Sequence, residues 1–402
     1  MLLRDLITAC GLPVVEIPPV PEGYRFIACL THDVDHPSIR RHKWDHTTLG
    51  FLYRAIVSSF TKFLRGRIPV RALFANWWAA FKLPFVQLGL AEDFWEEFDN
   101  RYSAIEEGRR STYFVIPFED RPGKKLDGLA PAFRAARYGA KDIAGKIKKL
   151  TGEGCEIGLH GIDAWLDSSS AKEELDEIRC LTGLTVPGVR MHWLYYSQQS
   201  PLMIEEGGAA YDSTVGYNEA VGYRAGTTQV YRPLNAARLL ELPLHVMDTA
   251  LFYPAHLNLS SREAETVLRQ MTGNAVQFGG CLTINWHDRS IAPERLWDTC
   301  YRDLLENLTA EGAWFATGVQ ATSWFRKRRS VVFETDDNGS GDVRASVQGD
   351  HNDDLPGLRL RVHRACPPSQ GSAWSTDYAD VTFQNSAATG MFVGCDIPSY
   401  RL

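Results

Sequence analysis

Short apolar runs alternate along the chain with segments of helical periodicity. We expect buried strands at residues 26–31, 111–117, 156–160, 188–192, 240–247, 282–287 and 313–317. Helical patterns lie between most of them, at 94–107, 141–151, 170–182, 200–207, 261–272 and 293–311. Strand–helix alternation repeated this often is typical of a parallel sheet covered by helices. About seven such units predict an α/β fold, a deformed (β/α) barrel whose active site gathers at the carboxyl ends of the strands.

Two segments depart from this alternation. From 330 to 402, short apolar runs are separated by Gly, Asn, Asp and Ser without helical period, which predicts a small β-rich domain after a barrel at 1–329. Residues 47–90 are long for a strand–helix connection and predict a helical insertion. Its apolar residues recur at helical spacing beside basic ones. Packing on the barrel is the simpler interpretation, and contact with a membrane interface is the alternative.

Composition excludes some functions. Of 402 residues, 43 are Lys or Arg and 49 are Asp or Glu, and this net charge of −6 argues against a nucleic-acid protein that works by bulk positive charge. The eight cysteines are scattered without a C-x-x-C pair, which favours a reduced compartment. The amino-terminal residues make a poor signal peptide. We therefore expect a cytoplasmic protein, with peripheral contact at the inner face of the membrane as the alternative.

Titratable residues follow the predicted strands. In Thr31-His-Asp-Val-Asp-His36, the two carboxylates of Asp33 and Asp35 point the same way, so one can bind a divalent metal while the other accepts a proton. His160 leaves the third strand, and Asp163 three residues later could reach the same ion. Each motif alone also fits a polar turn or a structural strand end.

Three further residues extend this pattern. Arg190 leaves the fourth strand, where a guanidinium can hold a carboxylate in place. Asp248 follows the fifth strand, and His287 ends the sixth. A histidine there can act as a general acid near neutral pH, and an adjacent carboxylate would favour its charged form. Alternatively, Arg190 forms an ordinary salt bridge and His287 has only a structural role.

Together these motifs resemble the polysaccharide deacetylases of carbohydrate esterase family 4, over residues 25–324. The resemblance implies a deformed (β/α) barrel with one divalent metal ion, zinc or another first-row transition metal. It implies that Asp33 is the catalytic base, Asp35 and His160 bind the metal, Arg190 orients the base and His287 is the general acid. It also implies that Asp248 helps to hold His287 in position. The implied reaction is hydrolysis of an N-acetyl group on a sugar, in a glycan or glycan precursor.

One position departs from the family pattern. The family usually has a second metal-binding histidine four residues after the first, where this chain has Ala164. Asp163 is the favoured substitute, and His36 and His192 are the alternatives because both lie beside other motifs. A carboxylate there would weaken any preference for zinc over other divalent ions.

The sequence also contains candidate substrate contacts. Arg224 could bind an anionic group of the substrate or fix a loop. Trp193, Tyr217 and Trp286 are candidate sugar-stacking platforms, although most aromatics at strand ends are packing residues. Two other functions stay open: an allantoinase-like C–N hydrolase acting on a small amide, and a non-catalytic carbohydrate-binding scaffold, which Ala164 would favour.

Overall fold

A curled parallel sheet forms the centre of the computed structural model, which describes residues 2–183, 186–335, 343–349, 354–363, 378–382 and 391–392. In spatial order its strands are β10 (Val246–Met247), β11 (Cys281–Asn285), β2 (Phe26–Val34), β3 (Thr112–Val115), β6 (Glu156–Gly161), β7 (Val189–Met191), β8 (Tyr211–Asp212) and β9 (Leu240–Glu241). A further strand, β12 (Ala313–Phe315), pairs with the first residues of β2. The predicted deformed (β/α) barrel is confirmed.

One chain segment joins the two edges of this sheet. Strand β9 pairs with β8 at one edge and β10 pairs with β11 at the other, although only four residues separate β9 from β10. Within these four residues, the backbone N–H of Leu242 donates to Asp212 and that of His245 to Thr283. The single strand expected at 240–247 is in fact two short strands. Pro243 interrupts it, because proline has no backbone N–H to donate to a neighbouring strand.

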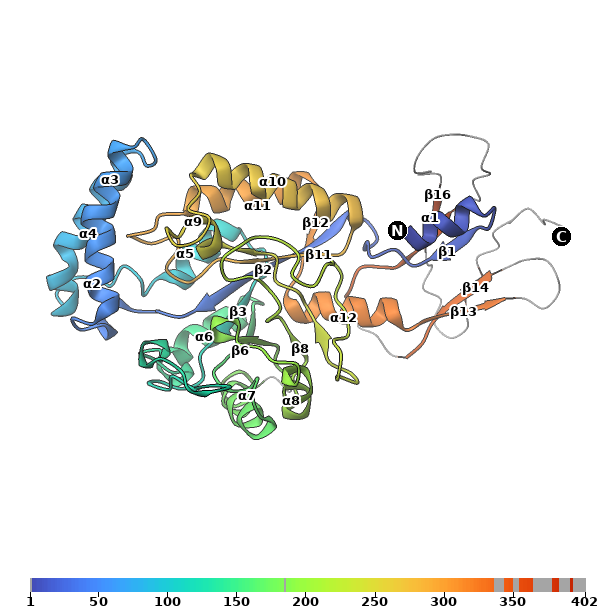
Figure 1. Cartoon of the computed structure of the whole chain (residues 1–402), viewed down its shortest axis with the longest axis horizontal. Helices are drawn as coiled ribbons and strands as arrows, with labels where there is room; N and C mark the ends of the chain where they lie inside the picture. Colours follow the sequence, from blue (N-terminus) through green and yellow to red (C-terminus); the bar gives the residue numbers. More distant parts are fainter. Residues whose placement is uncertain are drawn as a thin grey trace.

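Helices cover the outside of the curled sheet (Figure 1). Helices α10 and α11 pack together on one side, whereas α6, α7 and α8 lie on the other. The bounds are α5 (Phe98–Glu106), α6 (Ala144–Gly152), α7 (Ser168–Thr182), α8 (Ser200–Gly207), α9 (Asp248–Phe252), α10 (Ser261–Phe278), α11 (Asp298–Ala310) and α12 (Gly318–Arg329). The six helical predictions all fall on real helices. Short elements in the connections are η1 (Ile39–Arg41), β4 (Lys124–Lys125), β5 (Gly128–Leu129), η3 (Ala132–Arg134), η4 (Ala140–Ile143) and η5 (His192–Leu194).

The insertion between β2 and β3 is helical, as predicted. Helix α2 (His46–Leu52), a π-helical turn η2 (Tyr53–Ser58) and α3 (Ser59–Leu64) follow one another without a gap, and α4 (Val70–Gln87) packs back on them. These helices lie at the opposite end of the molecule from β1 and β13 (Figure 1). A small core of its own, centred on Phe51, Leu83 and Trp95, holds the insertion against the barrel.

The described residues after 330 are all-β. They form two three-stranded sheets, made of β13 (Val331–Thr335), β14 (Val343–Val347) and β17 (Met391–Phe392), and of β15 (Arg359–His363), β16 (Tyr378–Thr382) and β1 (Val14–Glu16). Strand β1 comes from the amino-terminal region, where it follows α1 (Leu2–Ala9). The predicted small β part is present, and it borrows one strand from the start of the chain.

Candidate metal and catalytic site

The site begins where β2 ends. All nine residues of β2 are buried, because the strand pairs on both sides and lies in the middle of the sheet. Asp33 lies near the end of this strand and Asp35 one residue beyond it, so both side chains reach the same edge of the sheet. His32 points the other way, where its Nε2 lies 2.8 Å from Oε1 of the buried Glu106. His32 is therefore a structural residue, outside the site.

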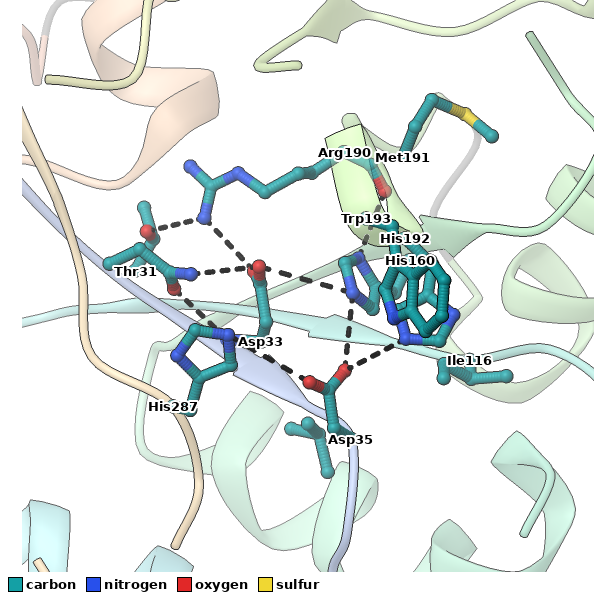
Figure 2. Close-up of polar contacts among 12 residues, drawn as sticks. Thr31, Asp33, Asp35, Ile116, His160, Arg190, Met191, His192, Trp193 and His287 are labelled. Carbon is teal, nitrogen blue, oxygen red and sulfur yellow. Dashed lines mark hydrogen bonds and ion pairs between the residues drawn. The ribbon is translucent and has the colours of Figure 1, made fainter. Parts of the chain in front are cut away.

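Three ligand atoms converge at this edge. The Oδ1 atom of Asp35 lies 3.3 Å from Nε2 of His160 and 3.7 Å from Nε2 of His192 (Figure 2). One ligand atom from each residue lies within 4.8 Å of the others. His160 comes from β6 and His192 from the first residue after β7, which is the neighbouring strand. Neighbouring parallel strands thus bring together residues that are far apart in the sequence.

The chemistry of these atoms fits a divalent cation. The Oδ1 atom of Asp35 is buried and has no hydrogen-bond partner in the described part of the chain. The Nδ1 atom of His160 lies 3.0 Å from the carbonyl oxygen of Arg190, so we assign its proton there, which leaves the Nε2 lone pair facing Asp35. Two facing lone-pair atoms repel each other unless a cation lies between them. One carboxylate and two imidazoles are typical ligands of zinc and other first-row transition metals.

The pKa values of these groups agree with metal binding. Burial lowers the pKa of His192 well below its ordinary value, which keeps the imidazole neutral, as a ligand must be. Burial alone would raise the pKa of Asp35, but the nearby His160, His192 and His287 outweigh it and hold that pKa well below its usual range. Both groups therefore present lone pairs at neutral pH.

Asp33 is held in a buried network beside these three ligands. Its Oδ1 accepts a hydrogen bond from Nη1 of Arg190 at 3.0 Å, and its Oδ2 accepts one from Nδ2 of Asn285 at 2.8 Å. Arg190 is fully buried and also donates to the hydroxyl of Thr31 and to both oxygens of Ser213. The carboxylate is therefore fixed in orientation, with Oδ2 3.9 Å from Nε2 of His160.

His287 and Asp248 form a second buried pair. The Nδ1 atom of His287 lies 2.6 Å from Oδ1 of Asp248, whose other oxygen accepts the backbone N–H of His287 at 2.7 Å. Burial alone would lower the pKa of His287, but the charge and hydrogen bond of Asp248 outweigh it and raise this pKa to about 10. Nε2 of His287 lies 3.8 Å from Oδ2 of Asp35, so a protonated imidazole faces the metal ligands (Figure 2).

The structure corrects the favoured third ligand. Asp163 accepts a hydrogen bond from the backbone N–H of Lys124 at 2.7 Å and lies outside the ligand cluster. Its carboxylate ties the β6–α7 connection to the segment around β4. His36 is also outside the cluster, because its Nδ1 lies 3.1 Å from Nε2 of His42. His192, one of the two alternatives, is the third member of the cluster.

Of the predicted substrate contacts, only Trp193 lines the cavity beside the candidate metal ligands. Trp193 lines a cavity of about 190 Å³ that includes Asp35 and His192, and its φ of 64° is rare for a bulky residue. Trp286 as a substrate platform is wrong, because its side chain is fully buried against Tyr301. Tyr217 is exposed and Arg224 donates to the carbonyl of Gly216, and neither lines this cavity.

Two residues next to the site, Asn285 and Arg134, were not predicted from the sequence. Asn285 lies two residues before His287, so the strand period of two could have shown it on the same face. Arg134, buried in the connection after β3, donates to the carbonyl of His192 at 2.8 Å and lines the cavity. Nothing in the local pattern around Arg134 signals this role, because its position depends on a long loop.

Comparisons with known proteins come from solved structures. No family model matches the sequence, and no curated protein matches it. A putative polysaccharide deacetylase from Mycobacterium smegmatis has a TM-score of 0.49 at 18% identity, over 78% of this chain and 96% of that one. A probable polysaccharide deacetylase from Pseudomonas aeruginosa has a TM-score of 0.45 at 17% identity, over 81% and 98%.

An allantoinase is also similar, with a TM-score of 0.45 at 16% identity, over 77% of this chain and 93% of that one. The TM-scores of all three structures lie below 0.5, so they show only a similar fold.

Proposed function

We propose that this protein is a metal-dependent hydrolase that removes the N-acetyl group from an N-acetylated sugar. The observation that carries the proposal is the convergence of Asp35, His160 and His192 beside two held groups, Asp33 and His287. A scaffold that only binds sugar would not need a fixed carboxylate on one side of the ligands and a charged imidazole on the other. This arrangement supports catalysis over the non-catalytic alternative.

The residues divide the proton transfers between them. A divalent ion held by Asp35, His160 and His192 would supply Lewis-acid chemistry for water and for the amide carbonyl. Asp33, oriented by Arg190 and Asn285, accepts the proton of the attacking water at its carboxylate.

His287 carries out the second transfer. It donates the proton on Nε2 to the leaving amine, while Asp248 keeps the other ring proton on Nδ1 and favours the charged imidazole. The acetyl C–N bond breaks, and acetate and a free amine leave.

A sugar substrate is favoured over a small amide by the room beside the ligands. The 190 Å³ cavity is lined by Trp193 and Phe133, aromatic faces on which a sugar ring can stack. A second cavity of about 510 Å³ shares one lining residue, Arg54, with it. Together they have space for a substrate larger than a small cyclic amide.

Metal content tests the ligand assignment. We expect one divalent ion per chain in the wild type and in Asp163→Asn, and its loss in His160→Ala and His192→Ala, because each removes one of three ligands. Elemental analysis after incubation with zinc, cobalt or nickel gives the result. Metal retained in His192→Ala but lost in Asp163→Asn would overturn the assignment. Acetate release from a panel of N-acetyl sugars, with allantoin as the comparison substrate, tests the reaction.

We also propose that the helical insertion contacts a membrane surface peripherally. No helix in the described part of the chain has the length and apolarity needed to cross a bilayer. Helix α4 and the residue after it instead expose a stripe of apolar side chains, Phe74, Trp77, Trp78, Phe81, Phe85 and Leu88. Residues 46–91 contain six Lys or Arg and no Asp or Glu, in a chain of net charge −6. Aromatic and basic groups together fit an anionic lipid interface. The cytoplasmic location predicted from the cysteines stays a prediction.

We keep the division into a barrel at 1–329 and an accessory β part at 330–402 as a proposal. Its support is the change from parallel β/α units to small antiparallel sheets after α12. Strand β1 crosses this division because it pairs with β15.

A further inference from the structure

The larger of the two cavities lies between the helical insertion and the barrel. Its volume is about 510 Å³, and it is lined by η2, α3 and α4 on one side and by the segments around 252–261 and 294–300 on the other. Five lining residues are cations, namely Arg54, Lys62, Arg67, Arg71 and Arg295, and two are carboxylates, Glu294 and Asp298. The cavity therefore has a positive lining in a protein whose net charge is negative.

Most of this positive charge is not neutralised. Arg54 forms an ion pair with Glu294, which is buried. Lys62 and Arg71 have no ion-pair or hydrogen-bond partner among the described residues, and Arg67 donates only a long bond of 3.4 Å to the carbonyl of Asn258. Burial lowers the pKa of Lys62, the charge of Glu294 opposes this, and the charges of Arg67 and Arg54 lower the pKa further. Such crowded cations favour an anion among them.

Three buried polar atoms on the cavity lining also lack hydrogen-bond partners among the described residues. Asn76 is 3% exposed, and its Nδ2 donates to the carbonyl of Glu294 while its Oδ1 has no partner in the described residues. The other two are Nε of Arg295 and Oε1 of Glu294, which form an ion pair at 3.8 Å without a hydrogen bond, while Nη1 of Arg295 donates to Ser290. A buried polar atom without a partner costs stability. The free acceptor Oδ1 of Asn76 therefore points to a ligand that donates a hydrogen bond there, such as a sugar hydroxyl.

The cavity adjoins the metal-site cavity at one residue. Arg54 lines both, and the smaller cavity contains the ligands Asp35 and His192. Arg54 extends from η2, a π-helical turn, and such turns are frequent at functional sites. A ligand that places an acetamido group near Asp35 and extends past Arg54 would enter the cationic cavity.

We propose that this cavity binds a phosphate group of the substrate, which makes the substrate an N-acetylated sugar joined to a phosphoester. Three cations lack strong partners, namely Lys62, Arg67 and Arg71. A ligand with a single carboxylate would leave some of this positive charge unpaired, whereas a phosphate dianion or a diphosphate can pair with all three. This inference rests on the proposed deacetylation, since it extends the same binding site. The phosphate could belong to a soluble sugar phosphate or to a lipid-linked one.

Binding is the first test, because it does not need turnover. We expect N-acetylglucosamine 1-phosphate to bind the wild-type protein at least about tenfold more tightly than the uncharged methyl glycoside of N-acetylglucosamine, as measured by calorimetry. Lys62→Gln and Arg71→Gln should each weaken the sugar phosphate about tenfold and leave the methyl glycoside unchanged. Arg65→Gln is the matched control, because Arg65 is an exposed cation of the same segment that does not line the cavity.

Equal binding of the two sugars, or equal losses in Arg65→Gln and Arg71→Gln, would overturn the phosphate site. Preserved phosphate binding without acetate release from any sugar would overturn the deacetylation and leave the phosphate site standing. Acetate release from the methyl glycoside at the same kcat/KM as from the sugar phosphate would leave deacetylation standing and overturn the phosphate site. A lipid-linked sugar phosphate in detergent, compared with the soluble one, distinguishes the two sources by its KM.

Discussion

At the scale of single residues, the site depends on how a carboxylate is held. Asp33 is buried between Arg190 and Asn285, and each donates one hydrogen bond to a different oxygen. A base in this position must keep one lone pair aimed at the substrate water, so loss of the Asn285 donor should cost activity more than stability. Arg190 also spans Thr31 and Ser213, so its removal would disturb three strands together.

Asn285→Ala tests this positioning role. We expect kcat to fall about tenfold, because one hydrogen bond to a charged group is worth roughly 1.5–3 kcal/mol, while KM and metal content stay the same. Asn235→Ala, at an exposed loop asparagine whose amide donates to the carbonyl of Gln198, is the control and should change neither. Steady-state kinetics with elemental analysis decides the point. A parallel loss of metal would assign Asn285 to the metal site instead.

At the scale of elements, the short strands β8 and β9 close one side of the sheet around a carboxylate pair. Asp212 and Glu241 are in register, fully buried, and each has one carboxylate oxygen without a hydrogen-bond partner among the described residues. Burial raises the pKa of Asp212 to about 6. Burial and the Asp212 charge raise the pKa of Glu241 well above its usual range. We therefore predict that the two unpartnered oxygens share a proton in the folded state.

This pair makes stability depend on pH. A folded-state pKa above the unfolded one contributes stability that is complete below the unfolded value, about 4, and is lost as pH rises through the folded value. The Asp212 part of this stability should thus disappear between about pH 4 and pH 6. The Glu241 part should disappear at higher pH, because its pKa lies well above the usual range.

Glu241→Gln should remove much of this dependence. The Gln amide has no proton to lose, and it can accept from the N–H of Val215, as Glu241 does, while donating to Asp212. We expect the variant to be more stable than the wild type at about pH 9, by on the order of 1–3 kcal/mol, and similar at about pH 5. Urea unfolding at both pH values measures this. Glu265→Gln, on the exposed face of α10, is the control, and an unchanged pH slope in Glu241→Gln would contradict the shared proton.

At the scale of the whole molecule, charge and apolar surface are unevenly distributed. The helical insertion lies at one end of the molecule (Figure 1). It holds six cations without an acidic residue and exposes the apolar stripe along α4. The same insertion lines the cationic cavity that adjoins the metal site. A protein that docks by this end would present both cavities close to a membrane surface, where a lipid-linked sugar would be accessible.

Vesicle binding tests that docking. We expect binding to vesicles containing anionic phospholipid, weaker binding to zwitterionic vesicles, and a fall with added salt, because exposed charges are screened. The double variant Trp78→Ser, Phe81→Ser should bind at least about tenfold more weakly, since each aromatic contributes roughly 1.5–3 kcal/mol when buried. Leu129→Ser, which removes an exposed apolar side chain on β5, is the control. Equal sedimentation of all three proteins would contradict the membrane proposal.

Local sequence determined much of this molecule. Apolar runs of strand length located the strands of the sheet, and the polar residues after them placed Asp33, Asp35, His160, Arg190 and His287 at one edge. This succeeds because a parallel strand buried on both faces needs a continuous apolar run, whose end is readable. The D-x-D spacing likewise needs only the strand period of two.

Tertiary structure alone decided how these residues combine. Asp163 is nearer to His160 in sequence than His192 is, yet it turns to the Lys124 backbone, whereas the pairing of β6 with β7 brings His192 to Asp35. The stretch 240–247 has one apolar pattern, but closure of the curled sheet divides it between two edges. Sequence determines which residues end each strand, because that depends on local pattern. Only the curvature and pairing of the sheet determine which strand ends meet, because those distances depend on the whole fold.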